Sequence, residues 1–198
     1  MKMLLVSAAL AAVAAPHMAA AQNVPSAVVA VVDVQRILGS CTACRSASAQ
    51  LQSQSNAIEA RTKALSGQLQ TEGNGIQTAA NALNGKEPDA ALKARYTAFQ
   101  SHQQAAEQEI ANRRNTLQST TANVQNQIAA RLNPIVNTVM GQRGANLVME
   151  KNATMANAPS LDITDTVLAE LNRQLPAVSV TPLPAASRPA ASPAPKGR

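Results

Sequence analysis

The middle of this chain repeats apolar residues at seven-residue intervals, and this repeat constrains the fold more than any other feature. Its first half consists of Leu51, Ile58, Leu65, Leu69, Ile76 and Leu83. One four-residue step within the series keeps it in a single heptad register, typical of the a and d positions of packed helices. Because partner positions such as Ser48, Ser55 and Thr62 are polar, we expect a thin seam. Three glycines between residues 67 and 75 lower the helix propensity further, which predicts a flexible arm.

A polar segment, LNGKEPDAAL at residues 83–92, interrupts the repeat. Asn84-Gly85 is typical of a helix end, Pro88 of a first helical position, and Asp89 of a new helix N-terminus. Two stripes then resume, one through Leu92, Phe99 and Ala106, the other through Tyr96, Gln103, Ile110, Leu117 and Val124. The segments 45–84 and 88–133 are therefore predicted to form an antiparallel helical hairpin about 60 Å long.

The residues on either side of the hairpin are predicted to form a small body. AVVAVVDV at residues 27–34 is typical of a strand buried on both faces. Asp33 is the expected N-cap of a helical turn after this strand, and Ser40 offers a second N-cap. Beyond the arm, short apolar runs around Lys151-Asn152 predict a β-hairpin. Thr164 is the expected N-cap of a closing helix. The apolar face of that helix consists of Val167, Leu168, Leu171 and Leu175.

The connection between arm and body contains Asn133-Pro134. This pair predicts that a new helix starts there and ends near residues 141–144, with a kinked continuous helix as the alternative. The body then comprises residues 22–44 and 141–175, which is about 58 residues and marginal as a lone core. We therefore expect other copies of the chain to supply burial. The predicted fold class is α+β, a small β-rich body with a long helical hairpin arm covering residues 45–140.

The two ends of the chain predict export and a tail. Residues 1–21 combine a basic start, an apolar run and an alanine-rich cleavage site, typical of a cleaved secretory signal. Residues 176–198 are rich in proline, alanine and serine and are predicted to be a disordered tail. Residues 22–175 carry 13 Lys and Arg against 11 Asp and Glu, although the whole chain is +6. The basicity lies mainly in the tail, so a nucleic-acid partner is not expected.

Two sequence blocks resemble the Skp/OmpH family of periplasmic chaperones for outer-membrane proteins. They are VVAVVDVQRIL near the start and ANLVMEKNATMANAPSLDITDTVLAELN near the end, and the resemblance covers about residues 27–175. It implies a periplasmic homotrimer whose three arms surround a cavity and hold unfolded outer-membrane proteins without ATP or any cofactor. The residues expected in the core of that trimeric body are Val29, Val31, Leu147, Met149, Ile163, Leu168 and Leu171.

The arm departs from the family pattern in its charge. Residues 45–130 contain eight Lys and Arg and six Asp and Glu, whereas the best-known members have strongly basic arms. The sequence therefore leaves open whether lipopolysaccharide or a membrane surface is a further partner, and it predicts a shallow salt dependence of client binding.

The cysteine pair Cys41 and Cys44 forms a C-x-x-C motif. A thiol–disulfide active site is one interpretation, but no βαβ unit follows the motif. A metal site would need about four ligands, and His102 lies far along the arm. A local disulfide or an incidental thiol pair at the corner between strand and helix is favoured.

Other candidate residues carry weaker signals. Tyr96 and Phe99 near the hairpin tip are candidate client contacts, although seam packing is the commoner role of such residues. Glu107 and Glu109 lie on different helix faces and are interpreted as solvated surface. The sequence contains no glycine-rich loop, metal-ligand cluster or catalytic triad. The function that the family resemblance implies, a non-enzymatic holdase, is therefore favoured. The alternatives are a periplasmic thiol oxidoreductase and a structural coiled-coil adaptor.

Overall fold

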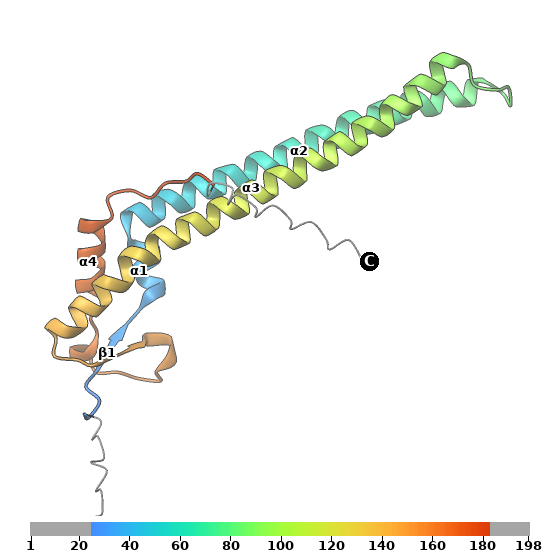
Figure 1. Ribbon diagram of the computed structural model, residues 1–198. Coiled ribbons are helices and arrows are strands. Elements are labelled where there is room, and N and C mark those ends of the chain that lie inside the picture. Colours follow the sequence, from blue (N-terminus) through green and yellow to red (C-terminus); the bar gives the residue numbers. More distant parts are fainter. Residues whose placement is uncertain (1–24, 183–198) are drawn as a thin grey trace, which may run out of the picture.

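A computed structural model describes residues 25–182 as a long two-helix arm that extends from a small body (Figure 1). The predicted signal segment, and the predicted tail beyond residue 182, lie outside the described residues. The elements, in chain order, are β1 Val29–Val32, α1 Val34–Ser40, α2 Thr42–Ala82, α3 Ala90–Gln142, β2 Leu147–Glu150 and α4 Thr164–Gln174, with 3₁₀ turns at Lys151–Ala153 and Pro159–Leu161.

The arm is the antiparallel pair α2 and α3, 41 and 53 residues long. The turn between them places Asn84 and Gly85 at φ angles of 48° and 84°, where glycine and asparagine are best tolerated. Asp89 caps α3, since its carboxylate accepts a 2.8 Å hydrogen bond from the Leu92 amide. Pro88 therefore precedes the cap, and the expectation that it occupies the first helical position is wrong.

The body end of α3 differs from the prediction at Pro134. We expected a helix to begin there, but α3 is continuous from Ala90 to Gln142 with Pro134 inside it. The neighbouring Ile135 and Val139 are buried in the body core, and this burial offsets the roughly 3 kcal/mol that an interior proline costs a helix. The predicted end near residues 141–144 is confirmed, because Gly144 has a φ of 68° just after the C-cap.

The start of α2 is capped by a cysteine. Asp33 caps α1 as expected, accepting a hydrogen bond from the Arg36 amide at 2.8 Å. The expectation that Ser40 caps the next helix is wrong, because Ser40 is the last residue of α1. Instead, Cys41 adopts an extended backbone and its Sγ accepts from the Cys44 amide at 3.2 Å.

The sheet of the body consists of β1 and β2 in parallel, with Val29 opposite Leu147 and Val32 opposite Glu150. The predicted β-hairpin around Lys151-Asn152 is therefore wrong. The residues after β2 form the 3₁₀ turn Lys151–Ala153 instead of a second hairpin strand, and Lys151 forms a 2.9 Å ion pair with Asp162. On the other side of β1, the Ile163 amide donates to the Val31 carbonyl. The whole arm is thus the crossover between two paired strands.

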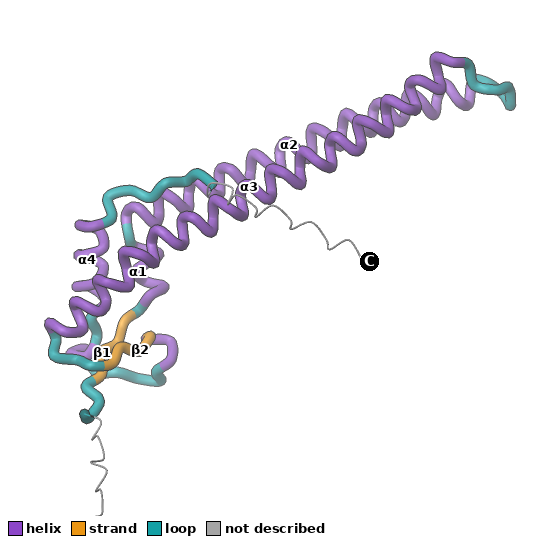
Figure 2. The backbone as a smooth tube through the Cα atoms, viewed as in Figure 1, coloured by secondary structure: helices purple, strands orange, loops and turns teal. Residues whose placement is uncertain are grey.

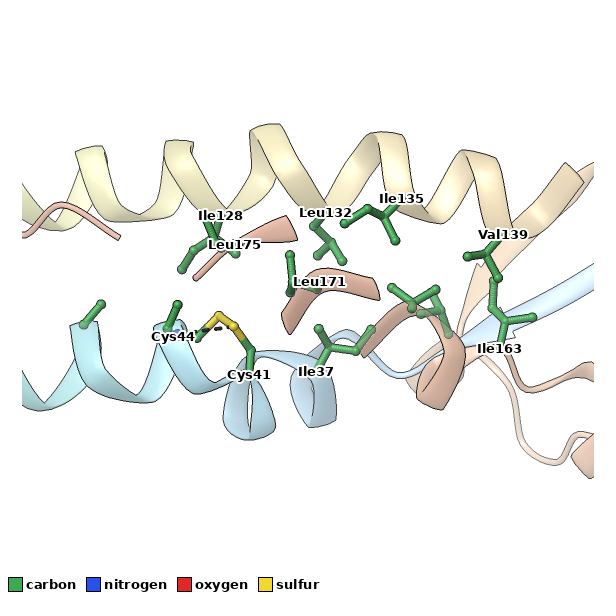
Figure 3. Packing of buried hydrophobic residues seen from close by; sticks show 14 of the residues in the cluster. Ile37, Cys41, Cys44, Ile128, Leu132, Ile135, Val139, Ile163, Leu171 and Leu175 are labelled. Carbon is green, nitrogen blue, oxygen red and sulfur yellow. Dashed lines mark hydrogen bonds between the residues drawn. A yellow bond between two sulfur atoms is a disulfide. The ribbon is translucent and has the colours of Figure 1, made fainter. Parts of the chain in front are cut away.

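A single apolar cluster holds α1, α4 and the bases of α2 and α3 together (Figure 3). Figure 3 shows Leu171 of α4 between Leu132 of α3 and Ile37 of α1. The expectation that Thr164 is the N-cap of α4 is wrong by one residue, because Thr164 is the first helical residue. Its buried hydroxyl accepts from the Asp33 amide at 2.9 Å and so ties α4 to the end of β1.

The segment after α4 also differs from the prediction. Residues 176–182 were expected to belong to a disordered tail, but they run along the base of the arm (Figure 2). Val178 and Val180 pack against the apolar cluster. The prediction treated the whole tail as too poor in apolar residues to order, whereas these two valines meet a surface that the arm already presents.

Candidate functional site

The arm is held together by a thin mixed seam. Beyond the body, its buried apolar residues are Ile58, Ile76, Ala106, Val124 and Ile128, each 5–9% exposed. The remaining heptad leucines are only partly buried, and Thr120, which is fully buried, satisfies its hydroxyl by donating to the Thr116 carbonyl at 2.8 Å. Small and polar groups thus occupy positions where a tight coiled coil carries large aliphatic side chains, so the two helices share little apolar area per turn.

Two of the arm glycines face α3. A Cβ atom at Gly73 would lie 3.5 Å from the Phe99 ring, and one at Gly75 would lie 3.1 Å from a guanidinium nitrogen of Arg95. Phe99 is partly buried on this contact. Tyr96, by contrast, is 54% exposed, so it is the more accessible of the two aromatic candidates near the tip.

The middle of the arm carries a charged bridge between its helices. Arg61 of α2 donates two 2.9 Å hydrogen bonds to the carboxylate of Glu109 on α3. Arg113 adds a third at 2.8 Å. Hydrogen bonds from Arg61 and then Arg113 lower the pKa of Glu109 to about 2. A second contact joins His102 and Glu72 at 3.0 Å.

Sequence reasoning missed this bridge, because it treated Glu109 as solvated surface. Arg61 and Glu109 lie at nearly equal sequence distances on either side of Lys86, as expected for an antiparallel hairpin. The same mirror relation holds for Glu72 and His102 and for Gly73 and Phe99. Pairing each arm residue with the one at the same sequence distance on the other side of the predicted turn would therefore have identified these contacts.

The body exposes apolar side chains around its sheet. Val28, Leu147 and Leu161 are all more than one-third exposed, and Met155 is fully exposed. Of the residues expected in the trimer core, the single chain buries Val31, Ile163 and Leu171. It partly buries Val29, Met149 and Leu168, and it leaves Leu147 45% exposed.

The C-x-x-C pair lies in the apolar cluster rather than at the surface. Cys41 and Cys44 form a disulfide at the first turn of α2 (Figure 3), and their exposed fractions are 0% and 6%. Thiol–disulfide exchange requires an accessible sulfur for the incoming thiolate. The burial therefore favours a structural disulfide over the oxidoreductase interpretation.

The described part of the chain offers neither a metal cluster nor a membrane span. Within residues 25–182, no group of three or more His, Cys, Asp or Glu side chains is placed to bind a metal ion. None of the helices in that range has an apolar stretch long enough to cross a bilayer.

These features define a class of protein in which a small α+β body carries a long, weakly packed helical hairpin. The chain belongs to the OmpH-like outer membrane protein family, whose model matches residues 28–171. This confirms the resemblance noted in the sequence, and it makes the protein a non-enzymatic one, as predicted.

The fold is also similar to a crystal structure from Caulobacter crescentus CB15, of an OmpH-like protein proposed to be an outer membrane chaperone. The TM-score is 0.66 at 17% sequence identity, and the match covers 84% of this chain and 96% of the other. At this identity, the likeness supports the shared fold. A search of curated proteins finds no match to this chain.

Proposed function

We propose that this protein is an ATP-independent periplasmic holdase that binds unfolded outer-membrane proteins between helical arms and prevents their aggregation. The observation that carries the proposal is the arm of α2 and α3, which extends from the body in a chain of the OmpH-like family. A holdase needs a large adaptable surface and no catalytic centre. The thin seam, with its glycines and partly buried leucines, supports such adaptability.

A homotrimer is part of the proposal, because a cavity needs more than one arm. A two-stranded parallel sheet is rarely stable alone, since parallel sheets are normally covered on both faces. In this chain Val28, Leu147 and Leu161 are left exposed beside the sheet. Burial of these side chains between bodies of neighbouring copies would supply the missing apolar contacts.

Native mass spectrometry of the mature protein without reductant measures the number of copies. We expect a trimer in which each chain is two hydrogens lighter than its reduced mass, consistent with the Cys41–Cys44 disulfide. A monomer at micromolar concentration would remove the basis for a shared cavity.

The holdase activity is tested by diluting a urea-denatured porin into buffer with and without the purified protein. We expect stoichiometric suppression of light scattering, and the same suppression with and without ATP. Failure to slow porin aggregation would contradict the proposed function. A structural coiled-coil adaptor would behave in this way, since it would bind one specific folded partner and ignore unfolded chains.

The charge of the arm sets a further expectation. Residues 45–130 carry eight Lys and Arg against six Asp and Glu, so the net positive field along the arm is weak. Client binding is therefore expected to depend mainly on apolar and backbone contacts and to change little with salt. A steep loss of porin affinity between low and high salt would contradict this expectation.

A further inference from the structure

Residues 176–182, which we term the strap, leave α4 and lie along the base of the arm (Figures 1 and 2). Their side chains alternate in environment. Val178 and Val180 are partly buried against the apolar cluster, whereas Ser179 and Thr181 are exposed. This alternation is that of an extended strand with one face on a core.

Amide side chains from both arm helices hold the strap by its backbone. Gln127 of α3 accepts from the Ser179 amide and donates to the Ser179 carbonyl, each at 3.0 Å. A neighbouring β-strand pairs with a residue in the same two-bond manner. Asn123 donates to the Thr181 carbonyl at 2.9 Å, and Gln54 of α2 makes a longer contact of 3.4 Å with the Val180 carbonyl.

All of these hydrogen bonds are made to backbone atoms of the strap, so none depends on the identity of a strap side chain. The groove formed by Gln54, Asn123 and Gln127, termed the strap groove, recognises an extended backbone with an N–H at the central position and apolar side chains on either side of it. Any segment with that alternation meets the requirement, and a proline at the central position fails it.

We propose that the strap groove is a binding subsite for extended client segments, and that the strap is its built-in occupant, which clients displace. This rests on the proposed function. Transmembrane strands of outer-membrane barrels alternate apolar and polar residues, so an unfolded client of this kind carries many segments with the apolar–polar alternation that the strap presents as Val-Ser-Val-Thr at residues 178–181.

Among the described residues, the groove continues beyond the strap. The strap runs toward the arm tip, since Ser179 lies at Gln127 and Thr181 at Asn123. In that direction a groove of about 520 Å³ continues, lined by Gln54, Ile58, Glu109, Arg113, Thr116 and Leu117 among others. A client segment longer than the strap would therefore gain contacts that residues 176–182 do not make.

Occupation by the strap weakens client binding, because the apparent dissociation constant equals the intrinsic one divided by the fraction of molecules whose groove is open. The strap is held by hydrogen bonds to its backbone and by two partly buried valines, while its polar side faces solvent, so it is held by far fewer buried contacts than the helices of the body and opens more readily than they do. A client with several strands at high local concentration would compete effectively, whereas a short free peptide would compete poorly.

The first test uses the full mature chain and the double variant V178D/V180D, which drives the strap out of the groove. The probe is a fluorescein-labelled eight-residue peptide that alternates valine with serine and threonine, and binding is measured by anisotropy. We expect at least about tenfold tighter binding to the variant than to the wild type. Adding Gln127→Ala to the variant should remove most of the gain.

Two controls bracket this test. Ala177→Asp introduces one aspartate, against two in V178D/V180D, at an exposed strap position and should leave peptide affinity unchanged. A peptide of identical composition with its valines grouped together should bind weakly to every variant. Equal affinity of the alternating peptide for wild type and V178D/V180D, or a gain that is insensitive to Gln127, would overturn the proposal.

A second measurement needs no variant and remains decisive if V178D/V180D does not fold. Hydrogen exchange of the Ser179 amide, which is bonded to Gln127, is followed in the wild type with and without bound urea-denatured porin. Exchange should become faster when porin displaces the strap. Porin captured with unchanged exchange at Ser179 would refute the subsite while leaving the holdase function intact. If the protein bound the peptide but did not suppress porin aggregation, the result would support the subsite and contradict the proposed holdase function.

Discussion

Replacing Gly67 and Gly73 by alanine is expected to stiffen the arm without a steric penalty. Both glycines lie in the interior of α2. A Cβ atom at Gly67 meets no heavy atom within 4 Å, and one at Gly73 lies 3.5 Å from the Phe99 ring, which is an ordinary van der Waals contact. Gly75 is left unchanged, because a Cβ atom there would force Arg95 to move.

The magnitude follows from helix propensity. Each glycine-to-alanine change in a helix interior contributes about 0.8–1.0 kcal/mol, so the pair contributes about 1.6–2.0 kcal/mol to the closed arm. Amides whose exchange requires opening of this stretch of α2 should therefore exchange about 15- to 30-fold more slowly.

Hydrogen exchange of residues 60–80, read by mass spectrometry, measures this effect. The matched control is Ala64→Gly, at an exposed position of the same helix, which should accelerate exchange by a comparable factor per substitution. Unchanged exchange in G67A/G73A would refute the reasoning, because it would mean that the arm opens as a rigid body rather than by local loss of helix. If flexibility serves clients of different size, the stiffened variant should lose suppression of large porins before small ones.

Three further predictions address the body and the charged bridge. Leu171→Ala, which empties a fully buried position of α4, should lower the free energy of unfolding by about 2–5 kcal/mol, measured by urea titration at fixed protein concentration. Because the folded-state pKa of Glu109 is about 2, below its ordinary 4.5, the arm should keep the bridge's stabilisation above pH 4.5 and lose it as the pH falls toward 2. Melting of Glu109→Gln should lose the part of this pH dependence that comes from the bridge, whereas the parts from Asp162 and Glu170, whose pKa values are also lowered to about 2, should remain. Replacing Cys41 and Cys44 together by serine should leave suppression of porin aggregation intact, which an oxidoreductase would not tolerate.

Matched controls keep these results interpretable. Leu38→Ala makes the same chemical change at a half-exposed position of α1 and should destabilise the single chain much less than Leu171→Ala. Glu107→Gln, two residues from the bridge and exposed, should leave the acid melting profile unchanged. Equal effects of the two leucine changes, or of the two glutamate changes, would contradict the packing and the ion pairing described above.

Short-range pattern was sufficient to predict the arm. The seven-residue spacing from Leu51 onward and the Asn84-Gly85 turn signal both depend on neighbours within a helical turn or two, and the structure has α2 and α3 where that spacing placed them. The Asp33 cap was predicted for the same reason, since a cap satisfies an amide only three residues away. Asp89 was predicted near the start of the second arm helix, and the structure makes it the cap itself.

Some errors were local and shifted a helix start by one or two residues, as at Ser40, Pro88 and Thr164. The larger errors occurred where residues distant in sequence meet. Pro134 stays inside α3 because Ile135 and Val139 are buried by other elements, and the run at Leu147 pairs in parallel with β1 rather than folding back on itself. Residues 176–182 are ordered only because the arm offers them a groove. Periodicity records which face of a segment is apolar, but it does not record which other segment will cover that face, and that choice is made by the packing of the whole chain.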